Sequence, residues 1–137
     1  MKKYKRILIR TDVSAPARKA VRVGLEIAKA MRVEAVGVYV RRSFTHVVSA
    51  EFDAAAEIER IREDARKEGD KALAAFERAA RKAKARFSTE RAKGDRAWQT
   101  VLDAARSLKC DLIVTAADGD TGNLLAHAKV PVLVVAR

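Results

Sequence analysis

Short apolar runs alternate with amphipathic stretches along the chain, and this spacing predicts strands separated by helices. Arg6–Arg10 and Ala35–Val40 are compact runs rich in β-branched side chains, which is typical of strands covered on both faces. Between them, apolar positions recur every three or four residues and predict a helix, with Ser14 as its N-cap and Pro16 in its first turn. Strand, helix and strand in this order form a βαβ unit, whose crossover we expect to be right-handed.

The middle of the chain predicts one long helix. Residues 41–50 form a polar connection that separates this helix from the second strand. From Glu51 the pattern stays helical for nine or ten turns and includes i,i+4 pairs of opposite charge. Gly69 interrupts the pattern and is a candidate bend, because glycine costs a helix interior about 1 kcal/mol relative to alanine.

The second half of the chain predicts three further strands. Phe87–Arg91 is a short and polar candidate for the third strand. Gly94 and Asp95 form a turn in which Asp95 caps the next amphipathic helix. The last two strands are expected at Asp111–Thr115 and Pro131–Ala136, where apolar residues form unbroken runs.

This alternation predicts an α/β fold, with one open parallel sheet flanked by helices in a single domain over residues 1–137. The arrangement is Rossmann-like. In such sheets, ligands bind beyond the carboxyl ends of the strands, at the point where the strand order reverses. With the first strand central, the reversal falls between it and the fourth strand. We therefore expect a site where the turn Thr11–Ser14 faces the loop Thr115–Gly122.

Two glycines follow the fourth predicted strand, in a loop with some features of a phosphate site. Gly119 and Gly122 form a Gly-x-x-Gly pattern beyond the end of a strand, where backbone N–H groups can approach phosphate without obstruction. However, Asp118 and Asp120 bring negative charge into the same loop, and only eight residues separate Gly122 from Pro131. The loop has the beginning of a nucleotide-binding motif and lacks the length for its completion.

The composition is that of an ordinary globular domain. The 137 residues are 49% hydrophobic and 34% charged, which is enough for a core that needs no disulfide. The longest apolar run has the length of a strand, so we expect no membrane span, and the apolar run near the start is too short for a signal peptide. Cys110 is the single cysteine, which suits a reducing compartment. We therefore expect a cytoplasmic protein.

The net charge of +11 is unevenly spread. Residues 1–42 carry +9, from twelve basic and three acidic side chains, and residues 78–96 carry +6, from eight basic and two acidic ones. Residues 51–77 carry −4. The two basic segments either meet on one face that attracts phosphate, or form solvated helix faces. The second interpretation is favoured, because beyond charge the chain has no hallmark of a nucleic-acid-binding protein.

Few residues offer catalytic or metal-binding chemistry. His46 and His127 lack partners at the spacing of a metal site, and His127 is expected near the end of the last helix, where a cation interacts well with the dipole. Cys110 is interpreted as a packed small residue and Ser14 as a helix cap. No acid–base pair or nucleophile arrangement is evident, so we predict no catalytic residue, no metal site and no enzymatic activity.

Three segments together resemble the universal stress protein family: RILIRTDVSAPARKAVRVGLEIAKA at the start, AKGDRAWQTVLDAARSLKCDLIV in the second half and HAKVPVLVV at the end. Their order and spacing, with the Thr-Asp-x-Ser turn, extend the resemblance over the whole chain apart from the middle helix. The resemblance implies the family's adenine nucleotide α-hydrolase-like fold, a parallel sheet of five strands in the order 3-2-1-4-5, which usually dimerises through the final strand.

The resemblance also implies a nucleotide site. Family members that bind ATP hold adenine and ribose at positions that correspond to Thr11, Asp12 and Val40 here. They hold the phosphates with Gly-x-x-Gly, then nine residues, then Gly-Ser or Gly-Thr at the start of the last helix. Gly119 and Gly122 match the first half of that motif, whereas the count of nine ends inside the last predicted strand. The second half is absent, and the last helix is reduced to two turns at most.

Two further departures weaken the expected phosphate binding. Ala116 stands where the family's loop usually begins with glycine, and Asp118 and Asp120 place negative charge near any phosphate. A like charge at about 4 Å costs a few kcal/mol near a protein surface. Asp12 is either a polar anchor in the cleft or a turn carboxylate that caps local N–H groups. We expect ATP to bind more weakly than about 100 μM, roughly −5.5 kcal/mol, and AMP or adenosine to bind no worse.

These features favour a stress-response or regulatory module that needs no cofactor and acts through protein partners. One alternative is an adenine-nucleotide-binding protein or weak ATPase, with ATP or AMP in the cleft between the loops after strands 1 and 4. Another is a nucleic-acid binder that uses the basic segments. Pro131–Ala136 is expected as an unprotected edge strand, apolar on both faces, and therefore as the contact of a homodimer. We expect no membrane contact.

Overall fold

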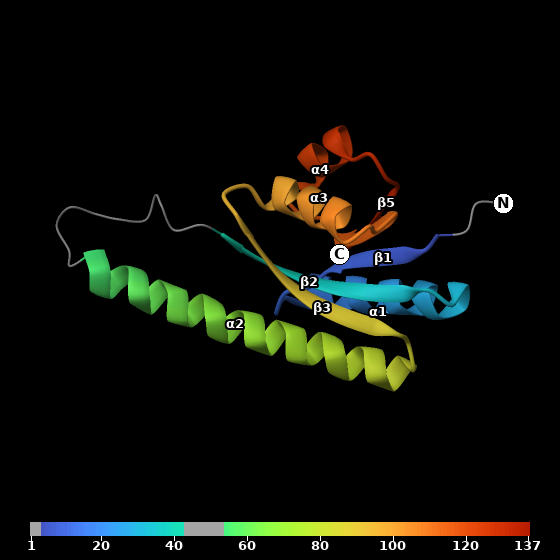
Figure 1. Cartoon of the computed structure of the whole chain (residues 1–137), viewed down its shortest axis with the longest axis horizontal. Helices are drawn as coiled ribbons and strands as arrows, with labels where there is room; N and C mark the ends of the chain where they lie inside the picture. Colours follow the sequence, from blue (N-terminus) through green and yellow to red (C-terminus); the bar gives the residue numbers. More distant parts are fainter. Residues whose placement is uncertain (1–3, 43–53) are drawn as a thin grey trace.

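Strands and helices alternate along the chain as the sequence predicts (Figure 1). The computed structural model describes residues 4–42 and 54–137. Its elements are β1 (Arg6–Arg10), α1 (Ala15–Met31), β2 (Glu34–Arg42), α2 (Ala54–Ala83), β3 (Phe87–Gly94), α3 (Ala97–Ser107), β4 (Leu112–Ala116), α4 (Thr121–His127) and β5 (Val132–Val135). Arg41 and Arg42, predicted to begin the polar connection, continue β2 instead, because their backbone pairs with β3. The rest of that connection, with His46, and the predicted helix start at Glu51 lie outside the described residues.

The five strands form one parallel sheet in the order β3-β2-β1-β4-β5, which confirms the predicted fold. β1 is central and pairs parallel with β2 on one side and with β4 on the other. Ile7 lies opposite Ala35 of β2 and Leu112 of β4. The strand order therefore reverses between β1 and β4, where the sequence places it.

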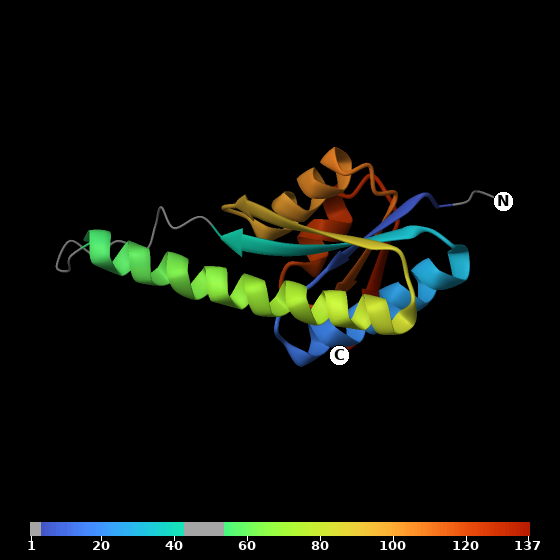
Figure 2. The same ribbon diagram turned by 60° about the horizontal axis from the view of Figure 1, so that its bottom comes forward.

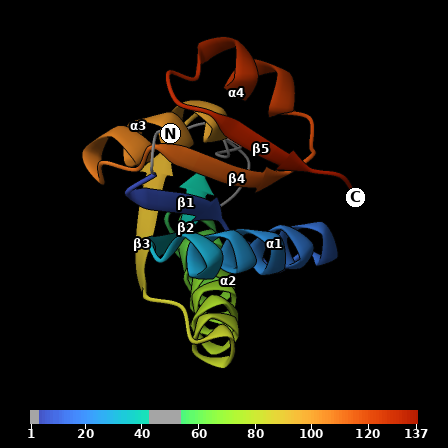
Figure 3. The ribbon, with the colours of Figure 1, turned by 90° about the vertical axis from the view of Figure 1, so that its right-hand side faces the viewer.

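Two layers of helices cover the sheet, α1 and α2 on one face and α3 and α4 on the other (Figure 3). The alternation of side chains along β1 serves both layers. Ile7 and Ile9 pack against α1 in one core cluster, and Leu8 packs against α3 in the other. All three side chains are fully buried, which explains why the strand reads as an unbroken apolar run.

α2 continues through Gly69, and the first turns of this helix extend past the end of β2 (Figure 2). The glycine is explained by packing and not by a bend. A Cβ atom at position 69 would lie 3.0 Å from the ring of Tyr39 and 2.8 Å from Nη1 of Arg91. Only glycine lets the helix backbone approach β2 and β3 this closely without displacing one of these side chains.

Predicted boundaries near β3 are also wrong. The strand runs to Gly94 instead of ending at Arg91, because its backbone pairs with β2 along its whole length although its side chains are polar. Asp95 is not the cap of α3: the helix begins one residue later than predicted. Arg96 takes the N-cap position and makes no side-chain capping hydrogen bond.

The packing of Phe76 on β2 generates a stability prediction. A Cβ atom at Gly37 would lie 2.6 Å from the ring of Phe76, which is 1% exposed and cannot move aside. Gly37→Ala should therefore lower the free energy of unfolding by about 1–3 kcal/mol, as overpacked cores do. Gly119→Ala is the matched control, because a Cβ there meets nothing within 4 Å. Urea denaturation measures both, and equal effects would contradict the packing described.

Candidate functional site

The candidate site lies at the carboxyl edge of the sheet, beside the point where the strand order reverses. A cavity of about 440 Å³ opens there. Its walls come from the turn after β1, the end of β2 and one side of α2. The residues that line it are Arg10, Thr11, Asp12, Val13, Ser14, Tyr39, Val40, Arg41, Ala65 and Glu68. The structure thus brings three predicted site residues, Thr11, Asp12 and Val40, into one cavity.

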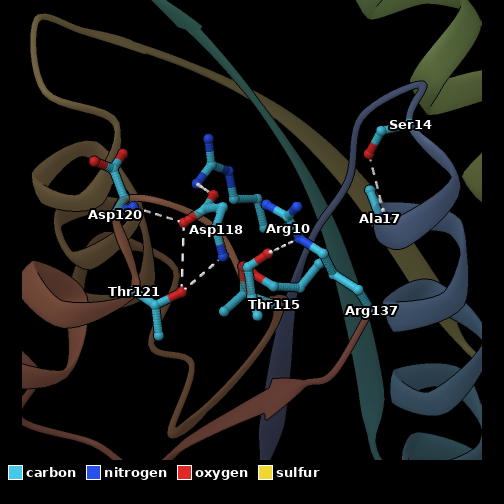
Figure 4. Close-up of polar contacts among 10 residues, drawn as sticks. Arg10, Ser14, Ala17, Thr115, Asp118, Asp120, Thr121 and Arg137 are labelled. Carbon is cyan, nitrogen blue, oxygen red and sulfur yellow. Dashed lines mark hydrogen bonds and ion pairs between the residues drawn. The ribbon is translucent and has the colours of Figure 1, made fainter.

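The turn after β1 is held by its own polar groups. The backbone N–H of Thr11, which is 3% exposed, donates to the carbonyl oxygen of Val38 at 2.9 Å. Oδ1 of Asp12 accepts from the backbone N–H of Ser14 at 2.6 Å. Oγ of Ser14 in turn accepts from the N–H of Ala17 at 3.2 Å, which confirms Ser14 as the N-cap of α1 (Figure 4).

Asp12 therefore has the local turn role that is one of its two interpretations. Its carboxylate is half-buried and also lines the cavity, and only Oδ1 has a hydrogen bond among the described residues. Oδ2 remains an acceptor available to a ligand. The two interpretations are compatible, because one oxygen holds the turn while the other has no hydrogen bond among the described residues.

α2 closes one side of the cavity, where Glu68 of this helix contacts Tyr39 of β2. Neither residue was singled out from the sequence. The hydroxyl of Tyr39 donates to Oε2 of Glu68 at 2.9 Å. Burial and, after it, the hydrogen bond and negative charge of Glu68 together raise the pKa of Tyr39 to about 12, so the hydroxyl keeps its proton. The available sequence signal was Gly69, whose missing side chain allows this approach of α2 to β2.

The two loop glycines lie apart from this cavity. Gly119 and Gly122 are exposed, and neither lines the cavity. Neither has a positive φ, and Gly122 lies in the first turn of α4. The helix has seven residues, in agreement with the two turns expected. The structure therefore places the predicted phosphate residues at the same edge of the sheet as Thr11, and it does not join them to one pocket.

Arg10 links the cavity to the glycine loop. Its side chain lines the cavity, and Nη1 forms an ion pair with Oδ2 of Asp118 at 3.3 Å (Figure 4). Oδ1 of Asp118 accepts from the backbone N–H of Asp120 at 2.8 Å. The backbone N–H of Asp118 donates to Oγ1 of Thr121 at 2.9 Å. Asp118 thus binds both a cationic side chain that lines the cavity and a backbone N–H of the glycine loop.

The other singled-out residues have structural roles. Cys110 is 5% exposed, and burial raises its pKa to about 11, which confirms a packed thiol of low reactivity. His127 ends α4 as predicted and stacks on Trp98, with ring centroids 4.6 Å apart. Within residues 4–42 and 54–137, no three His, Cys, Asp or Glu side chains gather as a metal site would require.

In the same two ranges, every helix is too short or too polar to cross a membrane.

Comparisons with known proteins agree with this architecture. The model of the Universal stress protein family matches residues 3–136. A protein of that family from Burkholderia pseudomallei is 26% identical, with a TM-score of 0.76 over 98% of each chain. UspA from Lactobacillus plantarum is 20% identical, with a TM-score of 0.79 over 98% of this chain and 99% of its own.

A universal stress protein from Archaeoglobus fulgidus, whose structure is a complex with dAMP, is 17% identical. Its TM-score is 0.74 over 97% of this chain and 98% of its own. No curated protein matches the chain.

Proposed function

The chain belongs to the universal stress protein family, and from this premise we propose that it is a stress-response regulatory module whose cleft favours adenosine or AMP over ATP. A cavity of about 440 Å³ is within the usual range of small-ligand pockets, about 300–1,000 Å³. Buried Thr11 and half-buried Val40 form its inner wall, and Oδ2 of Asp12 is an acceptor for a ribose hydroxyl. The Archaeoglobus relative in complex with dAMP supports an occupant of this size.

The contacts of Asp118 carry the discrimination against ATP. A second or third phosphate group would have to extend from the cavity toward the glycine loop. There it would meet Asp118, whose carboxylate already holds Arg10 and the N–H of Asp120. Arg10 offsets the charge of Asp118 and so reduces the repulsion expected from the sequence. Phosphate must still compete with Asp118 for the guanidinium of Arg10 and the N–H of Asp120. Asp118 has the advantage, because it is covalently part of the same loop.

The proposal is for binding without catalysis, in the cytoplasm, with signalling through protein partners. The carboxylate of Asp12 is committed to its turn through Oδ1, and the thiol of Cys110 is packed and protonated. A weak ATPase is the competing function. It requires ATP to reach the loop in the first place, so the same binding experiment decides between them.

Isothermal titration with ATP, AMP and adenosine tests the proposal. We expect ATP to bind more weakly than about 100 μM, or roughly −5.5 kcal/mol, and AMP or adenosine to bind at least as well. The reason is that only the adenosine part finds free groups in the cavity. Low-micromolar ATP affinity that is lost in Gly119→Val would show instead that the glycine loop binds phosphate, and would favour the weak ATPase.

The role of Asp118 generates a second prediction, on ligand preference. Asp118→Asn removes the carboxylate that holds Arg10, so ATP affinity should rise about tenfold, equivalent to 1.4 kcal/mol, while adenosine affinity stays unchanged. Asp120→Asn is the matched control, because it removes the same charge from the loop without releasing Arg10. Adding Arg10→Gln to Asp118→Asn should abolish the gain. Equal gains in ATP affinity in both single variants would show that only the net charge of the loop matters, and not the release of Arg10.

We also propose a homodimer through β5. This strand is at the edge of the sheet and pairs only with β4 within the described chain. Among the described large hydrophobic residues, Leu125 of α4 and Leu133 of β5 are exposed, at 51% and 37%. Leu125 lies in the short last helix and Leu133 in the edge strand, so apolar surface is exposed on both elements. Pairing of two edge strands about a two-fold axis would satisfy the free backbone groups and cover apolar surface.

The dimer proposal predicts the effect of a charge on β5. Val134→Lys places a cation on the edge strand that two copies would bring together, so it should yield monomers by multi-angle light scattering. Val134→Thr preserves the β-branched shape and should remain dimeric, which separates charge from a loss of strand propensity. An unmodified chain that is already monomeric at micromolar concentration would rule the proposal out.

A further inference from the structure

Basic residues gather at the amino edge of the sheet, the end opposite the candidate cleft. α1, α2 and α3 all end there, and the turns that follow lead into β2, β3 and β4 (Figures 1 and 3). Each turn contains a basic residue with a positive φ: Arg32 at 58°, Lys84 at 59° and Lys109 at 57°. Glycine or asparagine adopts this conformation at less cost than arginine or lysine.

The turns after α1 and α2 touch each other. Nζ of Lys29 donates to the carbonyl oxygen of Lys84 at 3.5 Å, and Nη2 of Arg86 donates to the carbonyl oxygen of Arg32 at 2.9 Å. Residues 29–32 and 84–86, which belong to the two basic segments of the sequence, therefore lie side by side at this edge.

The carboxylates of this edge are already occupied. Oε1 of Glu34 accepts from Oγ of Ser88 at 2.7 Å and from Nη2 of Arg6 at 3.1 Å, and the Ser88 hydrogen bond is the main cause that lowers the pKa of Glu34. The carboxylate of Asp111 accepts from the backbone N–H groups of Lys5 and Arg6. Both acids thus hold the starts of the strands together.

We call five exposed cations of this edge the amino-edge cluster: Lys29, Arg32, Lys84, Arg86 and Lys109. None of them forms an ion pair with a carboxylate of the described residues. Compensation of a helix dipole explains one cation at each helix end, and favours it in the last turn. It does not explain why the positive-φ position itself is basic three times.

The topology sets these cations in a row. The order β3-β2-β1-β4 places the turn of Lys84 at one end, that of Arg32 next to it and that of Lys109 at the other end. Neighbouring strands are about 4.8 Å apart, so the row spans about 15 Å. One strand of a nucleic-acid duplex rises about 3.4 Å per phosphate, so this length faces about four phosphates.

We propose that the amino-edge cluster binds the phosphate backbone of nucleic acid without sequence preference. The aromatic rings of this edge are engaged in packing: Phe87, at the start of β3, packs edge-on against Phe76 with Arg81 over its face, and Tyr4, just before β1, packs partly buried against the core. It also lacks the apolar side chains that insert into a bilayer, because the exposed large hydrophobics of the described residues, Leu125 and Leu133, belong to α4 and β5. A row of cations with no free stacking ring and no inserting apolar side chain fits a polyphosphate backbone.

The test is fluorescence anisotropy of a labelled 24-base-pair duplex with the intact protein. Contacts to about four phosphates should give a slope near −3.6 in log affinity against log salt, and hence a loss of about 100-fold in affinity between 50 and 200 mM salt. A duplex of scrambled sequence should bind equally. No binding at 50 mM salt, or binding to phosphatidylserine vesicles and not to the duplex, would overturn the proposal.

The decisive variant replaces the three turn residues with glycine: Arg32→Gly, Lys84→Gly and Lys109→Gly. Glycine suits their positive φ, so the fold should persist, which thermal melting checks. Affinity for the duplex should fall at least tenfold and the salt slope by about 2.7. The control removes three exposed cations elsewhere on α2, with Arg62→Gln, Lys67→Gln and Lys71→Gln. Equal losses in both triple variants would reduce the binding to net charge and overturn the assignment to this edge.

Binding of the duplex by the amino-edge cluster does not depend on the cleft at the carboxyl edge. Asp118→Asn changes the opposite edge and should leave duplex binding unchanged, so the proposed function and this inference can fail separately.

Discussion

Complete burial of β1 on both faces is the constraint from which the rest of the molecule follows. Ile7, Leu8 and Ile9 alternate across the sheet and are all inaccessible to water, so each face needs its own helix layer and each side its own parallel strand. With β1 central, the connections run outward in both directions and the strand order reverses beside it. Strand ends gather on one edge and helix ends on the other, which gives the molecule two chemically different edges.

At the carboxyl edge, the glycine loop contains an anion of its own. Asp118 takes up the guanidinium of Arg10 and a loop N–H, as a bound phosphate group would. Such a site disfavours phosphate by more than charge repulsion. The carboxylate of Asp118 is always present beside these donors at high effective concentration, whereas a phosphate group has to bind from solution. The cavity proposed for adenosine avoids this competition, because it is formed by the turn after β1, the end of β2 and α2.

The fold was predictable because its main signals are local. β-branched runs identified β1, β2, β4 and β5, and the three- to four-residue spacing identified α1. The end of β3 was not predictable, since its polar side chains give no strand pattern although its backbone pairs with β2 along its whole length. Asp95 failed as a cap because helix starts shift by a residue without changing the pattern.

The candidate site was only half predictable. Thr11, Asp12 and Val40 lie in one cavity, whereas Gly119 and Gly122 lie outside it. The closing contacts join distant positions: Tyr39 meets Glu68 across 29 positions, and Arg10 meets Asp118 across 108. Nothing in a single sequence indicates which of many arginines and aspartates will pair once the sheet has formed.

The length of β1 also keeps the charges of one edge of the sheet from acting on the other edge. Five residues at about 3.3 Å each separate them by about 16 Å, twice the screening length of about 8 Å in physiological salt. A charge gained or lost at the helix ends is therefore hardly felt in the cleft, and substitutions at the two edges should combine additively. With a short, fully buried strand between them, the proposed polyanion contacts and the proposed small-ligand preference can change as separate traits.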